Sequence, residues 1–313
     1  MGFRVEKYCG NQKEVWDKFV ATSKNGTFLF HRDFMEYHSD RFEDFSLMVF
    51  DQQQLVSILP ANISENIVHS HQGLTYGGLV FTDDFKIEKI SFIIQSIKVF
   101  LKNLNISKLI IKQLPEFYNQ HNTEIVNSAL IKNGAINIYS MMNLAVDYAT
   151  DVLISKSKLK HYRRIDASID LQVFEETSCD LFWNEVLIPR LLLKFNTTPL
   201  HSLSEIAFLK SKFPEKIRQF SVYIDNQIIA GLTLFESQNV VKSQYGATTS
   251  LGEKHRALDF LFINLIEKYK NEGKQFFDMG TVYNGTSVNE GLLNQKVELG
   301  CTVFHQNYYE LCI

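Results

Sequence analysis

The chain carries one pattern twice, and this internal repeat limits the fold more than any other feature of the sequence. In the first half, β-rich runs at residues 45–51 and 55–59 flank a Gln-rich turn. In the second half, β-rich runs at residues 220–225 and 228–234 flank a turn of Asn and Gln. Both copies are typical of a β-hairpin.

Further matches follow downstream in the same order. Tyr-Gly-Gly at residues 76–78 returns as Tyr-Gly-Ala at residues 245–247, which is 169 residues later. Two more pairs of segments are each separated by 166 residues: 107–111 with 273–277, and 134–136 with 300–302. Offsets that agree this closely indicate a duplicated unit.

The periodicity between these anchors also agrees between the halves. Apolar residues at helical spacing predict two helices before each hairpin, a long amphipathic helix after the third strand, and a shorter helix before the last strand. The predicted helices are 13–23, 31–39, 86–104 and 123–133 in the first half, and 181–195, 203–213, 254–271 and 287–299 in the second. We therefore predict an α/β fold with mixed sheets, made of two like domains at residues 1–150 and 151–313. The sequence contains no Pro/Gly/Ser-rich linker, so we expect the domains to be packed against each other.

Composition excludes several classes of protein. The 313 residues carry a formal net charge of −3, which argues against a basic DNA-binding protein and leaves room only for a local basic patch. We find no apolar signal segment, no myristoylation pattern (Glu6 stands where Ser or Thr is needed) and no apolar run of transmembrane length. The four cysteines are scattered, so we expect reduced thiols in a cytoplasmic protein.

Residues 155–169 form the first region suited to binding. Their spacing predicts a helix between the domains with one apolar and one cationic face. Lys160, Arg163 and Arg164 belong to the cationic face. This face is either a solvated surface or a site for a nucleotide diphosphate, a tRNA backbone or a CoA phosphate, since a guanidinium group binds two phosphate oxygens at once.

Residues 70–78 of the first half form a second region of this kind. Its glycines either admit a ligand close to the backbone or serve as turn residues. His71 and Tyr76 are candidate substrate contacts. We expect the rings of His69 and His71 to share one face of a strand, and no metal site there, because no further ligand cluster lies nearby. The GxGxxG, GxxxxGK[ST], GxSxG and HExxH patterns do not occur in the sequence.

The element order resembles the GNAT acyltransferase fold, and two such units in tandem resemble the FemAB/FemX-like acyl and aminoacyl transferases of the cell envelope. The basic segment 156–167 is similar to a family segment that ends in R-x-x-x-A. Residues 275–280 are similar to the family's aromatic-Asp-x-Gly strand end. Residues 291–300 are similar to the pattern G-L-x-x-F-K-x-G-F-G, with Gln295 and Glu298 in place of Phe and Gly.

This resemblance implies that the second domain is catalytic. Lys296 matches the family's lysine and would stabilise negative charge on a phosphate or on a developing oxyanion. Asp278 ends a strand, where α/β sheets place ligand groups, and would accept a hydrogen bond from the attacking amine or act as a general base. Tyr245 ends the third strand, where a GNAT fold receives its acyl donor. Tyr283 and Asn284 follow Asp278 and would line the same cleft.

Residues 250–257 match the GNAT phosphate cradle only in part. Gly252 is retained as a small residue, but Lys254 and His255 occupy the middle of the pattern. This favours an aminoacyl donor and leaves CoA as an alternative, because Lys254 and Arg256 can still contact phosphate.

We therefore expect an acyl or aminoacyl transferase that acts on an amine of a cell-envelope glycan or peptidoglycan precursor. Residues 1–150 would bind the acceptor or serve a structural role, and residues 151–313 would bind the donor. The co-substrate would be aminoacyl-tRNA or acyl-CoA, with no tightly bound cofactor. The partners would be a small-molecule or nucleotide-linked precursor and tRNA. Two alternatives stay open: an acetyl-CoA-dependent N-acetyltransferase, and a non-catalytic module that binds a glycan precursor or a partner.

Overall fold

A computed structural model describes residues 2–82, 86–119, 123–285 and 287–313. The chain forms two compact units. Unit 2 is the continuous stretch Met142–Val303, and unit 1 combines Met1–Met141 with the last residues, Phe304–Ile313.

Unit 2 is built on a sheet with the strand order β10-β11-β12-β13-β14-β9. Neighbouring strands are antiparallel except for β13 and β14, which are parallel. The strands are β10 (Gln172–Glu176), β11 (Ile217–Ile224), β12 (Gln227–Glu236), β13 (Val240–Thr248), β14 (Phe276–Thr281) and β9 (Ile136–Asp147). A short hairpin, β15 (Tyr283–Asn284) with β16 (Ser287–Val288), follows β14.

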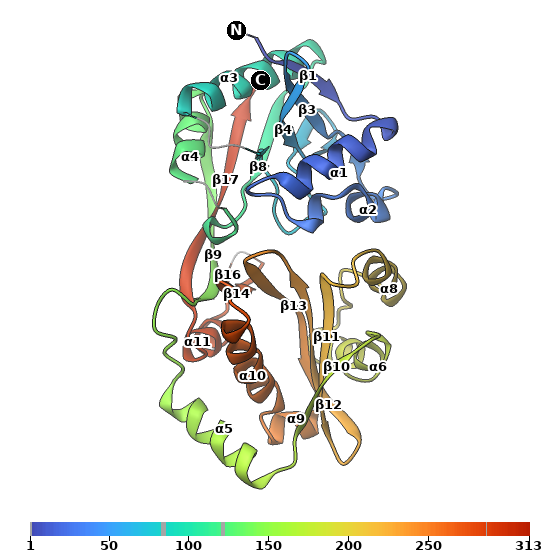
Figure 1. Cartoon of the computed structure of the whole chain (residues 1–313), viewed down its shortest axis with the longest axis vertical. Coiled ribbons are helices and arrows are strands. Elements are labelled where there is room, and N and C mark those ends of the chain that lie inside the picture. The colour runs from blue at the N-terminus through green and yellow to red at the C-terminus, as the bar shows by residue number, and fades with distance from the viewer. Residues whose placement is uncertain (1, 83–85, 120–122, 286) are drawn as a thin grey trace. The chain divides into compact units, whose positions relative to one another are not determined.

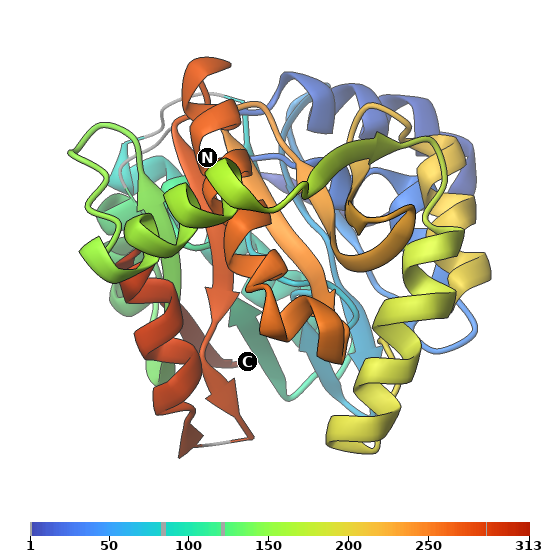
Figure 2. The same cartoon turned by 90° about the horizontal axis from the view of Figure 1, so that it is seen from below.

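Helices cover both faces of this sheet (Figures 1 and 2). One face carries α10, which buries eight side chains against the strands and neighbouring elements. The other face carries α6, a π-helical turn at Trp183–Leu187, and α8. The helices are α5 (Lys156–Ser168), α6 (Asp180–Phe182), α7 (Ile188–Phe195), α8 (Leu203–Lys212), α9 (Ser250–Lys254), α10 (Ala257–Asn271) and α11 (Glu290–Glu298).

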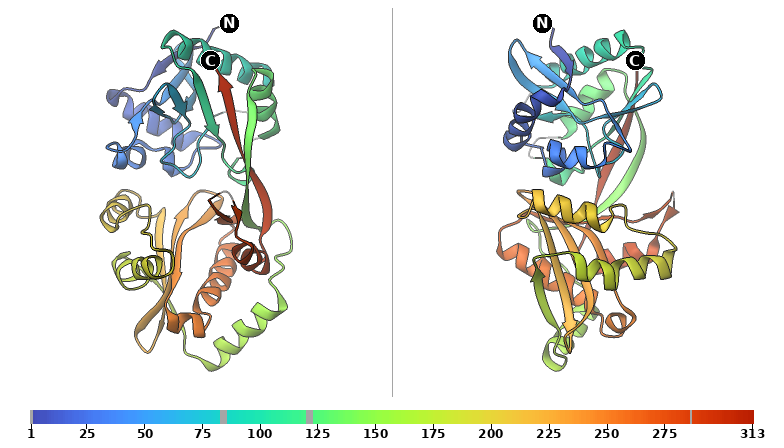
Figure 3. Two further views of the ribbon diagram at one scale, coloured as in Figure 1. Left: turned by 180° about the vertical axis from the view of Figure 1, so that it is seen from behind. Right: turned by 90° about the vertical axis from the view of Figure 1, so that its right-hand side faces the viewer.

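Unit 1 contains two groups of strands with helices beside them (Figure 3). The first group has the order β1-β3-β4-β7, with β1 (Arg4–Lys7), β3 (Leu47–Asp51), β4 (Gln54–Leu59) and β7 (Val80–Phe81). The second has the order β17-β8-β6-β5-β2, with β17 (Thr302–Cys312), β8 (Lys108–Lys112), β6 (Ile67–His69), β5 (Asn62–Ser64) and β2 (Glu43–Asp44). The helices are α1 (Lys13–Thr22), α2 (Arg32–Met35), α3 (Ile87–Asn103) and α4 (Thr123–Lys132).

The predicted duplication is confirmed in the hairpins. Strands β3 and β4 pair antiparallel, and so do β11 and β12. Both pairs contain a register shift at a corresponding place, after Val49 and after Val222. The turns use left-handed backbone at Gln52 in one hairpin and at Asp225 and Asn226 in the other, which matches the twist of the flanking strands.

Two sequence predictions about local structure were wrong. The long helix 254–271 is broken at Arg256, whose φ of +51° separates α9 from α10. His69 and His71 do not share a strand face, since β6 ends at His69 and His71 has a φ of +68°.

The observed division into units differs from the predicted division at residue 150, and strand β17 is the reason. Residues Tyr308 to Cys312 of β17 pair antiparallel with β8, and Tyr309 and Leu311 are buried in the apolar core of unit 1. The last residues therefore belong to unit 1, although the predicted boundaries assigned them to the second domain. None of the helices in the described part of the chain is long and apolar enough to span a membrane.

We predict that Leu311→Ala destabilises unit 1 by about 2–5 kcal/mol, because it leaves a cavity where a fully buried leucine was. Urea denaturation gives the loss, and hydrogen exchange of β8 assigns it to unit 1. The exposed neighbour Cys312→Ala is the matched control and is expected to change stability by less than about 0.5 kcal/mol. Equal effects of the two substitutions would show that β17 does not complete this core.

Candidate functional site

Strands β13 and β14 separate after only three residue pairs. The parallel register runs from Val240–Phe276 to Lys242–Asp278, whereas β13 continues to Thr248. In β14 a register shift against β9 follows Asp278, and Gly280 has a left-handed φ of +76°. This bulge bends β14 away from the ladder. The edge of β13 beyond Lys242 is thus not paired with β14.

A buried charged cluster lies where the strands separate. The carboxyl group of Asp278 is fully buried; its Oδ2 accepts a hydrogen bond from Lys242 Nζ at 3.1 Å, and its Oδ1 accepts one from Gly280 N at 2.7 Å. Lys296 Nζ donates to the carbonyl oxygens of Gly280 (3.1 Å) and Thr281 (2.6 Å). The structure therefore brings together Asp278 and Lys296, two of the predicted catalytic residues, and adds Lys242.

The surroundings of Lys296 lower the pKa of its ammonium group. Burial, followed by the nearby charge of Lys242, lowers its pKa from 10.5 to about 8, while Asp278 acts in the opposite direction. One carboxylate thus lies close to two ammonium groups in a region with little solvent. Removal of that carboxylate would leave the buried cations uncompensated.

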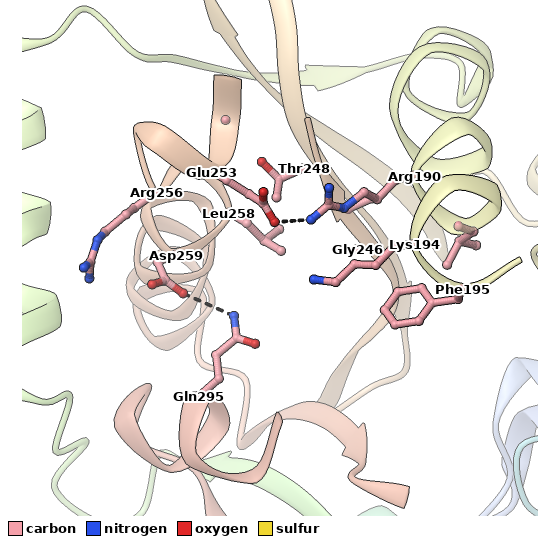
Figure 4. A pocket seen from close by; sticks show the side chains of 13 residues that line it. Arg190, Lys194, Phe195, Gly246, Thr248, Glu253, Arg256, Leu258, Asp259 and Gln295 are labelled. Atoms are coloured by element: carbon pink, nitrogen blue, oxygen red, sulfur yellow. Dashed lines mark hydrogen bonds and ion pairs between the residues drawn. The ribbon is translucent and has the colours of Figure 1, made fainter. Parts of the chain in front are cut away.

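A pocket of about 310 Å³ opens beside the end of β13 (Figure 4). Its wall includes Gly246 and Thr248 of β13, Gly252 and Glu253 of α9, and Arg256 before α10. Three residues of α7 also line this wall and add charge or an aromatic ring: Arg190, Lys194 and Phe195. This volume falls at the lower end of the range for small-molecule sites.

The pocket has more cationic than anionic side chains. Arg190 forms an ion pair with Glu253 across the pocket, and Lys194 points toward the same space (Figure 4). The N-terminus of α10 begins at the pocket without a side-chain cap, and its helix dipole adds partial positive charge. An anionic group is the ligand chemistry that this wall favours.

The predicted basic helix adjoins the pocket. Arg256 and Asp259 line both the pocket and a small recess against α5 that also contains His161. After burial, the charges of Arg256, Arg164 and Lys160 are the causes that lower the pKa of His161. Lys160 and Arg164 are exposed on α5. Two groups of predicted phosphate ligands are therefore neighbours in space; Arg163 is exposed on the same helix.

Asp259 connects three helices beside the pocket. Its Oδ2 accepts from the buried Lys158 of α5 at 2.7 Å, and its Oδ1 accepts from Gln295 Nε2 of α11 at 3.3 Å. Lys158 also lies 3.6 Å from Glu298. Gln295 and Glu298 are the two departures from the family pattern, and both serve this network.

Tyr245 lies away from this cluster. Its hydroxyl contacts Nδ1 of His201 and accepts a hydrogen bond from His201 N at 3.3 Å. Its ring packs edge-on against Trp183, with the ring centroids 4.9 Å apart. Burial raises the pKa of Tyr245 to about 12, so the phenol is neutral at physiological pH. Tyr245 therefore lies on the face covered by α6 and α8.

The remaining predicted residues have various environments. Lys254 is exposed at the end of α9. Gly252 lines the pocket, but a Cβ there would lie 2.3 Å from the carbonyl oxygen of Ile229, so close packing already requires glycine. Tyr283 accepts a hydrogen bond from Met142 N at 3.4 Å. Asn284 belongs to β15, and its side chain lies outside the described part of the structure.

His71 and Tyr76 are buried in unit 1. His71 packs against His38 and Phe42, and burial lowers its pKa to about 3. The hydroxyl of Tyr76 lies 3.2 Å from Thr27 Oγ1. Their predicted contact with substrate stays a prediction.

Sequence reasoning missed Arg190, Lys194 and Lys242. The first two lie four residues apart, so they share one helix face, and this spacing could have revealed a cationic wall. Lys242 follows two valines but precedes Ser243 and Gln244, so the sequence carries no clear signal that this lysine is buried. In the described residues, no group of three or more His, Cys, Asp or Glu side chains could hold a metal ion.

Comparisons with known proteins identify the fold. No family model and no curated protein sequence matches the chain. The structure of FemX is similar with a TM-score of 0.72 and 11% identity, over 99% of this chain and 97% of that one. L-PGS from Bacillus licheniformis is similar with a TM-score of 0.62 and 11% identity, over 99% of this chain and 92% of that one. A tandem GNAT protein from the clavulanic acid biosynthesis pathway is similar with a TM-score of 0.54 and 8% identity, over 99% of this chain and 98% of that one. The chain therefore has the FemX-like tandem GNAT fold that its element order predicts.

We predict that the lowered pKa of Lys296 makes stability depend on pH. Between about pH 8 and 10.5 the unfolded chain holds more protons at this site than the folded protein does, so the free energy of unfolding rises with pH. Between pH 7 and pH 10.5, the free energy of unfolding of the wild type should rise by about 3 kcal/mol more than that of Lys296→Met. Urea denaturation across this range measures the difference.

The exposed Lys270→Met, at the far end of α10, is the matched control. The free energy of unfolding of this variant should differ from that of the wild type by a constant amount over the same pH range. A constant difference for Lys296→Met as well would contradict the lowered pKa of the buried Lys296.

Proposed function

We propose that unit 2 is an acyl or aminoacyl transferase that moves an acyl group from an activated donor to an amine. The observation that carries this proposal is the unpaired edge of β13 beside the pocket, beyond the last pair at Lys242–Asp278. An open strand edge offers main-chain N–H and C=O groups to a ligand that contains amides, as an added strand would. The FemX-like fold supports the same placement of the donor.

The charges around the pocket favour a donor with phosphate groups. Arg256 would hold a phosphate near the start of α10, with Lys194 on the opposite wall. Lys160 and Arg164 of α5 would extend the binding surface toward a longer nucleotide. Both acyl-CoA and aminoacyl-tRNA have this chemistry, and the α5 surface favours the larger donor.

The proposed reaction is direct attack by a neutral amine on the donor's carbonyl carbon. A C–N bond forms, the C–S bond of a thioester or the C–O bond of an aminoacyl ester breaks, and the amine loses one proton to water or to the leaving group. Main-chain N–H groups on the β13 edge would stabilise the tetrahedral oxyanion. The pocket would contribute by holding both reactants in line.

Asp278 and Lys296 would act as positioning residues in this scheme. Both are buried at the point where the strands separate, and neither contributes to the pocket wall. Lys296 holds two carbonyl oxygens at the end of β14, which maintains the gap that the donor enters. Tyr245 would support the neighbouring strand β13 from the opposite face through His201.

The acceptor in this proposal is an amine of a cell-envelope glycan or peptidoglycan precursor. The likeness to FemX supports this class, and unit 1 would bind the acceptor or serve a structural role. All four cysteines are free thiols, in keeping with the cytoplasmic location that we propose.

A second candidate function is a non-catalytic module that binds a nucleotide-linked precursor. It is favoured by the placement of Asp278 and Lys296, which do not line the pocket wall. The same pocket and cations would serve binding without transfer. A transfer assay separates the two functions.

We predict that the purified chain transfers label from acetyl-CoA or from aminoacyl-tRNA to an amino-sugar nucleotide or a muropeptide. Arg256→Ala should raise the KM for the donor about tenfold or more, since a charge-assisted hydrogen bond to phosphate is lost. Steady-state kinetics with the donor varied provides the measurement.

Lys270→Ala, an exposed substitution on the same helix as the pocket's α10 residues, is the control and should leave the KM unchanged. Donor binding in a thermal-shift assay without transfer to any acceptor would favour the binding module. Transfer with an unchanged KM in Arg256→Ala would overturn the placement of the donor phosphate.

A further inference from the structure

An ion pair crosses the pocket of unit 2. Arg190 of α7 and Glu253 of α9 meet over the space beside the end of β13 (Figure 4). The side chain of Arg190 is 16% exposed, whereas that of Glu253 is 47% exposed. The guanidinium group thus lies mostly inside the pocket, and the carboxylate keeps much of its contact with water.

Helix α7 brings two cations to this wall. Lys194 follows Arg190 by four residues, so both lie on one face of α7, and both line the pocket. Like charges at this spacing repel each other. Glu253 is the acid that pairs with Arg190, and the ammonium group of Lys194 lies 5.6 Å from the centroid of the Phe195 ring. The α7 side of the pocket therefore attracts a further anion.

The other carboxylate of the pocket wall is held by different partners. Asp259 accepts hydrogen bonds from Lys158 at 2.7 Å and from Gln295 at 3.3 Å. Among the described residues that line the pocket, Glu253 is thus the acid that neutralises the α7 cations. An anionic ligand that approaches Arg190 meets the charge of Glu253.

The backbone that carries Glu253 is held against β12. The carbonyl oxygen of Ile229 accepts hydrogen bonds from Thr249 N at 2.8 Å and from Thr248 Oγ1 at 3.1 Å. A Cβ at Gly252 would lie 2.3 Å from the same oxygen. Because α9 is packed so closely, the ion pair can open by rotation of the Glu253 side chain, and α9 itself does not need to move.

The strength of this ion pair is small compared with that of a phosphate contact. A pair with a carboxylate this exposed contributes at most about a factor of five to an equilibrium constant. A phosphate group with two negative charges attracts the same guanidinium more strongly, and it can accept two parallel hydrogen bonds from it. A phosphate that reaches Arg190 is therefore able to displace the carboxylate of Glu253.

We propose that Glu253 competes with a phosphate group of a reactant for Arg190. When the phosphate binds, the Glu253 side chain rotates toward solvent, and Arg190 and Lys194 contact the phosphate oxygens. A ligand without an anionic group near α7 leaves the ion pair in place, so the competition selects for doubly charged groups. This inference deepens the proposed function, on which it rests only for the choice of a reactant that carries phosphate.

Isothermal titration of the full chain with inorganic pyrophosphate, at neutral pH and fixed ionic strength, tests the competition. Glu253→Gln should lower the Kd about fivefold, because the competing charge is removed. Arg190→Met should raise the Kd about tenfold, since a charge-assisted hydrogen bond is lost. In the Arg190→Met background, Glu253→Gln should change the Kd by less than about twofold, because only a screened charge is then removed.

Glu272→Gln is the matched control. Glu272 forms an ion pair with Lys268 at the far end of α10, and the two side chains are 39% and 35% exposed. This substitution removes the same charge and a similar pair outside the pocket, so the Kd should stay unchanged. Both Glu→Gln substitutions should lower the melting temperature by less than about 4 °C.

Several results would overturn the competition. These are no pyrophosphate binding by either the wild type or Glu253→Gln, an unchanged Kd in Glu253→Gln, and an equal gain in affinity with and without Arg190. An unchanged Kd with a larger fall in melting temperature would show that the pair only fastens α7 to α9.

Transfer kinetics distinguish the two possible sources of the phosphate. Glu253→Gln should lower the KM of the reactant that brings it: a fall for the donor alone assigns the phosphate to the donor, and a fall for the acceptor alone assigns it to the acceptor. Unchanged KM values for both reactants would contradict the proposal. The pyrophosphate titration needs no transfer, so failure of the proposed function and failure of the competition are separate outcomes.

Discussion

The end of the β13–β14 ladder is the constraint on which the candidate site depends. Two parallel strands can separate only if the groups at the last pair are satisfied by other partners. Lys242 and Asp278 form that last pair, and Asp278 also accepts the amide of Gly280. Lys296 holds the next carbonyl oxygens of β14. The gap beside the pocket is therefore maintained by a buried charged cluster as well as by the bulge.

The charged residues of unit 2 fall into two groups with different roles. The buried cluster supports the backbone of β14, whereas Arg256 and Lys194 line the open pocket. Asp259 joins α5, α10 and α11, so the basic helix is attached to the pocket wall through the buried Lys158. The substitutions Gln295 and Glu298, which weaken the likeness to the family pattern, are compatible with this fold because both contact that network.

Local patterns predicted the hairpins and most helices, since these depend on residues that are near one another in sequence. These patterns failed where the backbone conformation of one residue ends a helix or a strand, as at Arg256 and His71. Residue type alone does not predict a left-handed φ at a non-glycine residue. Asp278 and Lys296 were found through a resemblance. Lys242 was missed because its pairing with Asp278 is set by strand register, and the cations of α7 were missed because the pocket is formed by segments far apart in the chain.

The membership of β17 in unit 1 also bears on the order in which the protein can be made. Unit 2 is continuous, so its whole sequence leaves the ribosome before residues 304–313 do. Strand β8 can pair with β6 beforehand, but it obtains its second neighbour, β17, only with residues 308–312. All segments of unit 2 are thus present before unit 1 has its full set of strands. Loss of residues 304–313 would damage unit 1 while leaving the pocket-forming segments of unit 2 intact.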